Sequence, residues 1–228
     1  MLTQTAQSLL GRRRGRRQIV ASAYASIGLA CAFLALLLVL HILKPDLDPA
    51  WRWISEYEIG RYGWMMRLAF FCWGGSVLAL AVTLWPSLRP APGILSGSWL
   101  IVIAVALVGA GVFKTDAITN RTSSRESTLH SIFGAVVILT FPIAATLVAV
   151  SLFRGAGWSA SHGLLILATT LTWVGLVVFV ASNIWAGSRT PSADRIGDPG
   201  VRVGWQNGFM VVTYAVWVVV VSAASLRL

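Results

Sequence analysis

The sequence predicts an all-α protein, a six-helix transmembrane bundle with short cytoplasmic loops and longer polar extracytoplasmic loops. The composition is 57% hydrophobic and 11% charged, and the mean hydropathy is +0.76. Six apolar stretches are each about 20 residues long or longer, the length that a helix needs to cross a bilayer. Backbone groups in lipid must bond within their own segment, and these stretches lack the alternation of transmembrane strands, so we expect helices.

The chain begins with a polar stretch, residues 1–18, that carries five arginines directly before the first apolar run. Such a cluster resists translocation, so we expect 1–18 to be a basic cytoplasmic tail and 19–228 to be a single six-helix transmembrane domain. The first apolar run continues for 25 residues and no small-x-small cleavage site follows it, which favours a retained anchor over a cleaved signal. Binding of anionic lipid headgroups is the alternative role for the arginines.

Six spans are expected in order along the chain. The first ends where an acid-rich stretch begins, and the second runs between Trp64 and Trp85. The third is among the shortest, the fourth contains Pro142, and the fifth ends at Trp185. An indole ring favours the headgroup level of a bilayer, so tryptophans at these limits support the assignment. The expected limits are Ile19–Leu43, Trp64–Trp85, Leu95–Phe113, Leu129–Phe153, Gly163–Trp185 and Gly208–Leu226.

The acidic residues are segregated. All eight fall in three loops on one side of the expected bundle, residues 44–63, 114–128 and 186–207, and none falls in the two loops on the other side. Basic residues do not decide the orientation, since eight lie on the side of the N-terminus and ten lie on the opposite side. The dense N-terminal cluster therefore carries the assignment that both termini are cytoplasmic.

The candidate site lies in and beside the acid-bearing loops. Asp116 and His130 are expected to end neighbouring spans on the same face, where a carboxylate can orient an imidazole and raise its basicity. Charges near lipid need partners, so we expect one network centred on these two residues, with Arg125 and at least one of Asp46 or Glu56 in reach. The candidate ligand-binding or network residues are His41, Asp46, Asp48, Ser55, Glu56, Asp116, Arg125 and His130.

The first of these loops is expected to cover the ends of the helices. Ser55 and Glu58 have the spacing of a helix capping box, which predicts a short helix over residues 56–60. Its aromatic residues alternate with charged ones, so an interfacial helix can bury the rings while its charges find partners.

A metal ion is an open alternative for this site, although no cofactor is expected. Two histidines and one carboxylate, His41, His130 and Asp116, are the candidate ligands, because a catalytic metal usually takes three protein ligands and a water. Membrane lipids are the expected partners, and the candidate ligand is a lipid headgroup or a small polar molecule. Nucleic acid is not expected, since many of the arginines are spread among short loops between apolar spans.

Several short motifs occur in a recognisable order. They are Pro45-Asp46-Leu47-Asp48-Pro49, Ile54-Ser55-Glu56-Tyr57, Gly60-x-x-Gly63-Trp64, Gly111-Val112-Phe113-x-Thr115-Asp116, Leu129-His130 and Gly204-Trp205-Gln206-Asn207. With them the chain resembles the domain-of-unknown-function 998 (DUF998) family of bacterial multi-pass membrane proteins. Lys114 and Asn207 depart from the pattern, which favours proline and arginine at these positions. The resemblance implies six helices in a bacterial inner membrane and supplies no reaction.

Three classes of function fit these patterns. The first is a ligand-binding or transport-related membrane protein with a charged outer vestibule. The second is a structural or accessory membrane subunit whose outer charges pair with one another. The third is a metal-assisted intramembrane lipid hydrolase.

The expected topology can be tested by labelling single cysteines in a variant that lacks Cys31 and Cys72. With both termini cytoplasmic, an impermeant thiol reagent added to intact cells should label a cysteine at Ser192 and not one at Ser87, because the two positions lie on opposite sides of the membrane. The reverse labelling pattern would show that the bundle is inverted.

Overall fold

The computed structural model describes residues 2–88, 91–189, 196 and 200–228, and in these residues it contains helices and no strand. Side chains are described from Gly15 onward, apart from residues 89–92, 189–195 and 197–199. Six helices are long and apolar enough to cross a membrane, as the composition predicts. They are α1 (Leu2–Leu43), α2 (Gly63–Leu84), α3 (Ala91–Val112), α4 (Arg125–Leu152), α5 (His162–Arg189) and α6 (Gly204–Ser225), with short 3-10 helices η1 (Ile54–Glu58) and η2 (Ala156–Ser161).

The limits of α2 to α6 agree with the expected spans to within four residues at each end. Helix α1 differs, because it begins at Leu2 and continues through the arginine cluster that the sequence marks as a polar tail. Arginine is a good helix former and no proline interrupts residues 2–43, so nothing local ends the helix at the membrane surface. The segment that is apolar enough to cross a membrane starts at Gly15.

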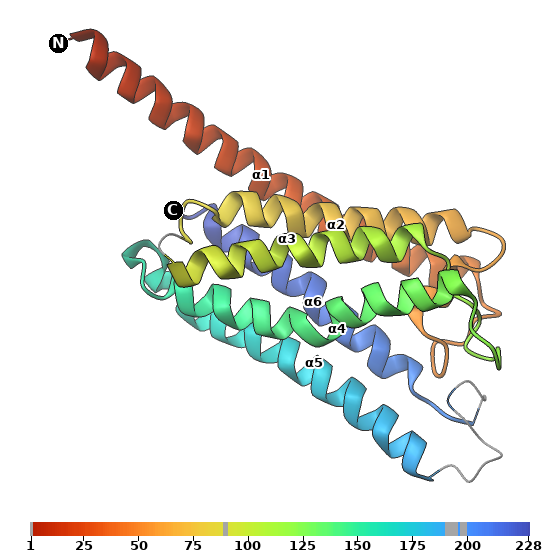
Figure 1. The fold of residues 1–228 in the computed structure, drawn as a ribbon. Helices are drawn as coiled ribbons and strands as arrows, with labels where there is room; N and C mark the ends of the chain where they lie inside the picture. The colour runs from red at the N-terminus through yellow and green to blue at the C-terminus, as the bar shows by residue number, and fades with distance from the viewer. Residues whose placement is uncertain (1, 89–90, 190–195, 197–199) are drawn as a thin grey trace.

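The helices form one closed bundle (Figure 1). Helices α1, α2, α3 and α4 pack in chain order, α5 packs on α4, and α6 returns to contact α1, α2, α4 and α5. Both termini lie at one end of the bundle, and the N-terminal part of α1 projects beyond it (Figure 1). We call the opposite end, formed by residues 44–62, 113–124 and 200–203, the loop end.

Buried hydroxyl groups join three of the helices. Ser222 of α6 donates to Ser26 of α1 at 2.8 Å, and Ser26 donates to the backbone oxygen of Ser76 in α2 at 2.8 Å. All three side chains are fully buried. Lipid removes most of the hydrophobic driving force between helices, so interhelical hydrogen bonds and close packing hold such a bundle together.

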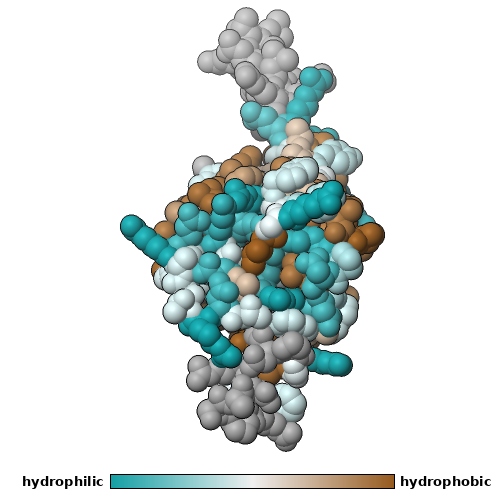
Figure 2. Space-filling model, turned by 90° about the vertical axis from the view of Figure 1, so that its right-hand side faces the viewer, coloured by the Kyte–Doolittle hydropathy of each residue, from teal (hydrophilic) through white to brown (hydrophobic). Residues whose placement is uncertain are grey.

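The loop end presents mostly hydrophilic side chains, and hydrophobic ones show along parts of its rim (Figure 2). This distribution is the one expected of a bundle whose sides face lipid and whose end faces the headgroup region and water.

Close packing of α5 on α6 depends on Gly175. A Cβ atom at this position would lie 2.6 Å from Thr213 Oγ1 and 3.0 Å from the Cα atom of Met210. We expect Gly175→Ala to lower the free energy of unfolding by about 1–3 kcal/mol, because the two helices must separate to admit the methyl group. The measurement is thermal or denaturant unfolding of the purified protein in detergent.

The matched control is Gly28→Ala in α1, where an added Cβ meets no atom within 4 Å. Alanine has the higher helix propensity, so the control should be as stable as the parent protein or slightly more stable. Equal losses in the two variants would contradict the close-packing explanation.

Candidate functional site

Helix η1 lies over the loop end of the bundle and is part of its core. Ile54 and Tyr57 are buried and belong to the main hydrophobic cluster, together with residues of α1, α2 and α6. The expectation that the first loop packs over the helix ends is confirmed. Its register is corrected, because η1 spans Ile54–Glu58 and Ser55 lies inside it.

Glu56, not Ser55, caps η1. The Glu56 side chain is 1% exposed, and its Oε2 accepts a hydrogen bond of 3.1 Å from the backbone N–H of Trp53. Its Oε1 accepts from Arg52 Nη1 at 2.7 Å and from the backbone N–H of Ile118 at 2.8 Å. A buried carboxylate is stable only when several hydrogen-bond donors replace the water that it loses. Because one of these donors is the N–H of Ile118, Glu56 joins η1 to the loop between α3 and α4.

Two further side chains hold the backbone of η1. Lys44, 5% exposed at the end of α1, donates through Nζ to the carbonyl oxygens of Tyr57 and Ile59. Burial lowers the pKa of Lys44, while Asp46 and Glu56 oppose this shift. Asn207 of α6 accepts a hydrogen bond of 3.0 Å through Oδ1 from the backbone N–H of Ile54. Helix η1 is therefore fixed to α1 and to α6.

The last acid of η1 pairs with α2. Glu58 Oε1 accepts from Arg67 Nε at 2.9 Å, with the carboxylate 1% and the arginine side chain 37% exposed. Burial raises the pKa of Glu58, and Arg67 opposes this shift. A carboxyl with a raised pKa favours its protonated form in the folded state, so its contribution to stability falls as the pH rises towards that pKa.

The expected pairing of Asp116 with His130 is wrong. Asp116 Oδ2 accepts from the backbone N–H of Ser124 at 2.6 Å, beside the start of α4. His130 Nδ1 instead lies 2.8 Å and 3.0 Å from the carbonyl oxygens of Ala110 and Phe113, at the end of α3. Carbonyls at a helix end lack intrahelical partners, so they compete well for a nearby imidazole. Among the described residues, the ion pairs Arg52–Glu56 and Arg67–Glu58 lie in and beside η1 instead.

The other predicted site residues are spread over the loop end. His41 donates through Nδ1 to Leu37 of its own helix at 2.7 Å, and its ring lies 4.8 Å from that of Tyr57. Burial, Asp48, Asp46 and Glu56 together raise the pKa of Tyr57 to about 12. Asp46 and Arg125 are exposed, and Asp48, also exposed, accepts from the backbone N–H of Ala50. Asp194 and Asp198 lie outside the described residues.

The candidate metal ligands do not come together. Among the described residues, no group of three His, Cys, Asp or Glu side chains could hold a metal ion. His41, Asp116 and His130 therefore form no such group, which corrects the expected ligand set.

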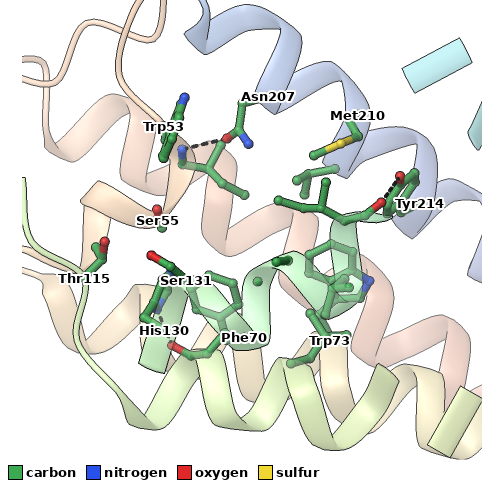
Figure 3. Close-up of a pocket in the computed structure, with 18 of the residues that line it drawn as sticks. Trp53, Ser55, Phe70, Trp73, Thr115, His130, Ser131, Asn207, Met210 and Tyr214 are labelled. Atoms are coloured by element: carbon green, nitrogen blue, oxygen red, sulfur yellow. Dashed lines mark hydrogen bonds between the residues drawn. The ribbon is translucent and has the colours of Figure 1, made fainter. Parts of the chain in front are cut away.

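A cavity of about 350 Å³ lies in the loop-end half of the bundle (Figure 3). Most of its walls are apolar side chains from all the long helices except α1, among them Phe70, Trp73, Leu107, Phe179 and Met210. Polar groups gather towards the loops, where Ser55, Thr115, His130, Ser131 and Asn207 line it. The cavity therefore has an apolar body and a polar mouth.

A second, polar pocket of about 190 Å³ adjoins this mouth. Three residues, Trp53, Thr115 and Ser131, line both spaces. The remaining lining of the polar pocket is Glu56, Asp116, Ala117, Ile118, Asn120, Arg121, Thr122, Ser123 and Ser127.

The sequence patterns missed several residues of this site. The spacing of Arg52 and Glu56, four residues apart, could have indicated their ion pair. The sequence indicates Asn207 only as part of a motif. Thr115 and Ser131 carry no local signal, since a hydroxyl on an apolar helix or in a loop is common in any membrane protein.

Comparison with known proteins gives one match. A family model described as "Protein of unknown function (DUF998)" matches residues 5–224, which is nearly the whole chain. No curated protein and no solved structure matches the chain. The match confirms the resemblance that the motifs predicted.

Stability of the loop end should depend on the Glu56 carboxylate. Glu56→Gln cannot accept all three hydrogen bonds and leaves Arg52 partly buried without its counter-charge. We expect a loss of roughly 3 kcal/mol in the free energy of unfolding in detergent, together with faster proteolysis within residues 113–124.

The matched control is Glu126→Gln, since Glu126 is exposed in the first turn of α4. It should change stability by about 0.5 kcal/mol or less. If Glu56→Gln were as stable as this control, Glu56 would not hold the two loops together.

Proposed function

The chain belongs to the DUF998 family of proteins of unknown function, and we propose from its own cavity that it binds an amphiphilic lipid taken from the surrounding membrane. In this proposal an acyl chain lies in the apolar cavity and a polar head lies at the loop end. The protein is then an integral membrane binding protein, and the proposal includes no chemical reaction.

The supporting observation is the contact between the two spaces. An apolar cavity of about 350 Å³ and a polar pocket of about 190 Å³ share Trp53, Thr115 and Ser131. Binding sites for small molecules are mostly apolar concavities with a few convergent polar groups. A ligand with one apolar and one polar part matches this arrangement, whereas a small polar solute would leave the apolar walls unfilled.

Access from the membrane lies on the α4 face of the cavity. Ser131, Ala135 and Leu139 are spaced by four residues, so they lie on one face of α4, and all three line the cavity while remaining exposed. Helix α5 diverges from α4 towards the loop end (Figure 1). Nearer the other end the two helices are joined by a hydrogen bond of 2.9 Å from Trp173 Nε1 to Thr146 Oγ1. A lipid can therefore reach the cavity sideways.

The proposed location is a bacterial inner membrane with both termini cytoplasmic. The N-terminal arginines support this orientation. The cavity then lies in the outer half of the membrane, and its ligand comes from the outer leaflet.

A structural or accessory role is the second candidate. It is favoured by the contacts of Glu56 and Glu58, which serve the folding of the loop end and leave these carboxylates no role in a charged vestibule. The two candidates differ in whether the cavity needs to be open.

Filling the cavity should abolish lipid binding. Gly134 lines the cavity on α4, and a Cβ atom there would meet no atom within 4 Å. Gly134→Leu should therefore fold normally while its side chain occupies the space proposed for the acyl chain. We expect the purified variant to bind roughly tenfold less lipid than the parent protein, both lipid that copurifies and lipid that is added, as measured by native mass spectrometry.

Gly28→Leu is the matched control, because Gly28 is also a helical glycine with open space around its Cβ position and does not line the cavity. This variant should retain lipid like the parent protein. Unchanged lipid retention in Gly134→Leu would favour the structural role over the binding role.

A further inference from the structure

We infer that the ligand of this cavity is a lipid with an uncharged head that bears hydroxyl groups, such as a monoacylglycerol or a glycolipid. The inference rests on the proposed lipid-binding function and adds the chemical class of the head. It is drawn from the hydrogen-bonding groups that the fold leaves unused at the mouth of the cavity.

The cavity carries no charge. None of its lining residues, all of them in the described part of the chain, is Asp, Glu, Lys or Arg. The adjoining polar pocket has Arg121 together with Asp116 and Glu56, so it contains no excess of positive charge. An anionic head moved from water into these spaces would lose hydration without gaining a counter-charge, which is strongly unfavourable.

His130 presents an acceptor. Its Nδ1 lies within hydrogen-bond distance of two carbonyl oxygens, those of Ala110 and Phe113. Carbonyl oxygens only accept, so Nδ1 carries the hydrogen and Nε2 has a lone pair. Nε2 has no partner among the described residues, and the side chain, 7% exposed, lines the cavity. An anion beside this lone pair would be repelled, whereas a hydroxyl group can donate to it.

Asn207 presents a donor. Its Oδ1 accepts from the backbone N–H of Ile54 at 3.0 Å, and this bond fixes which end of the amide is the oxygen. The Nδ2 group therefore keeps two hydrogens for which the described residues supply no acceptor. Asn207 is 5% exposed and lines the cavity close to η1 (Figure 3). A ligand oxygen at this point would satisfy a buried donor.

Two hydroxyl groups complete the set. Ser55 and Ser131 line the cavity, and neither side chain has a hydrogen-bond partner in the described part of the chain. These residues supply one fixed acceptor, one fixed donor and two groups that can do either, and Trp53, which also lines the cavity, has a buried indole N–H without a partner in the described part of the chain. Hydroxyl groups both donate and accept, so an uncharged polyol can satisfy all of them. Replacing one hydroxyl of such a head with an ionised phosphate, as in lysophosphatidate, brings a negative charge into spaces that hold no excess of positive charge.

The experiment compares three lipids with the same single acyl chain on the delipidated full-length protein, in a detergent without a sugar head. The lipids are monoacylglycerol, lysophosphatidate and the fatty-acid methyl ester, and bound copies are counted by native mass spectrometry. We expect one copy of monoacylglycerol to bind roughly tenfold more tightly than either of the others. Gly134→Leu should abolish this binding, and Gly28→Leu should leave it unchanged.

A double variant, Ser55→Ala with Ser131→Ala, removes hydroxyl groups that the fold does not use, so it should fold normally and lose most of the preference for monoacylglycerol. The head-group inference would be overturned if lysophosphatidate or the methyl ester bound as tightly as monoacylglycerol and Gly134→Leu abolished that binding. The proposed lipid-binding function would still hold in that case. If no lipid bound in a way that depends on Gly134, both the proposed function and this inference would fail.

Discussion

The carboxylate of Glu56 is the constraint on which the loop end depends. It is almost fully buried, and it joins the start of η1, the side chain of Arg52 and the backbone of the loop between α3 and α4. A buried carboxylate is stable only with several donors, so the positions of all three are linked. With Lys44, Asn207 and Arg67, it fixes η1 to α1, α6 and α2. The fixed position of η1 also determines the shape of the cavity mouth, because Trp53, Ile54 and Ser55 line the cavity.

Charged and uncharged polar residues therefore have separate tasks in this protein. The buried charges have partners within the protein. Lys44 donates to backbone carbonyl oxygens, Glu56 accepts from Arg52 and from backbone N–H groups, and Glu58 pairs with Arg67 of α2. The polar groups that face the cavity are uncharged. This division follows from the low dielectric of the site, where an unpaired charge costs far more than an unpaired hydroxyl or amide. The ligand proposed above, a lipid whose head forms hydrogen bonds without carrying charge, matches this division.

The site could be predicted only in part. The sequence indicates that polar residues concentrate at one end of the bundle, and the structure brings Ser55 and His130 to one cavity there. The sequence does not indicate that Asp116 bonds to the start of α4 or that His130 bonds to the end of α3. Both outcomes share a reason: unsatisfied backbone groups at helix ends compete for side chains, and which of them lies nearest depends on how neighbouring helices are staggered. The capping of η1 by Glu56 is the same effect within a short helix.

What the sequence by itself determined is the class of the protein and the limits of its membrane helices, apart from the start of α1. Length and hydropathy decide these, because a helix in lipid must satisfy its own backbone and must be about 20 residues long to cross. Only the tertiary structure decided that α6 returns to close the bundle, that α4 and α5 separate near the loop end, and that a cavity lined by α2 to α6 forms there. These features arise from contacts between residues far apart in the chain, such as Asn207 with Ile54 and Gly175 with Thr213. The hydropathy of a segment does not predict such contacts. An apolar helix face is equally compatible with lipid and with another helix, so hydropathy does not say which neighbour packs against it.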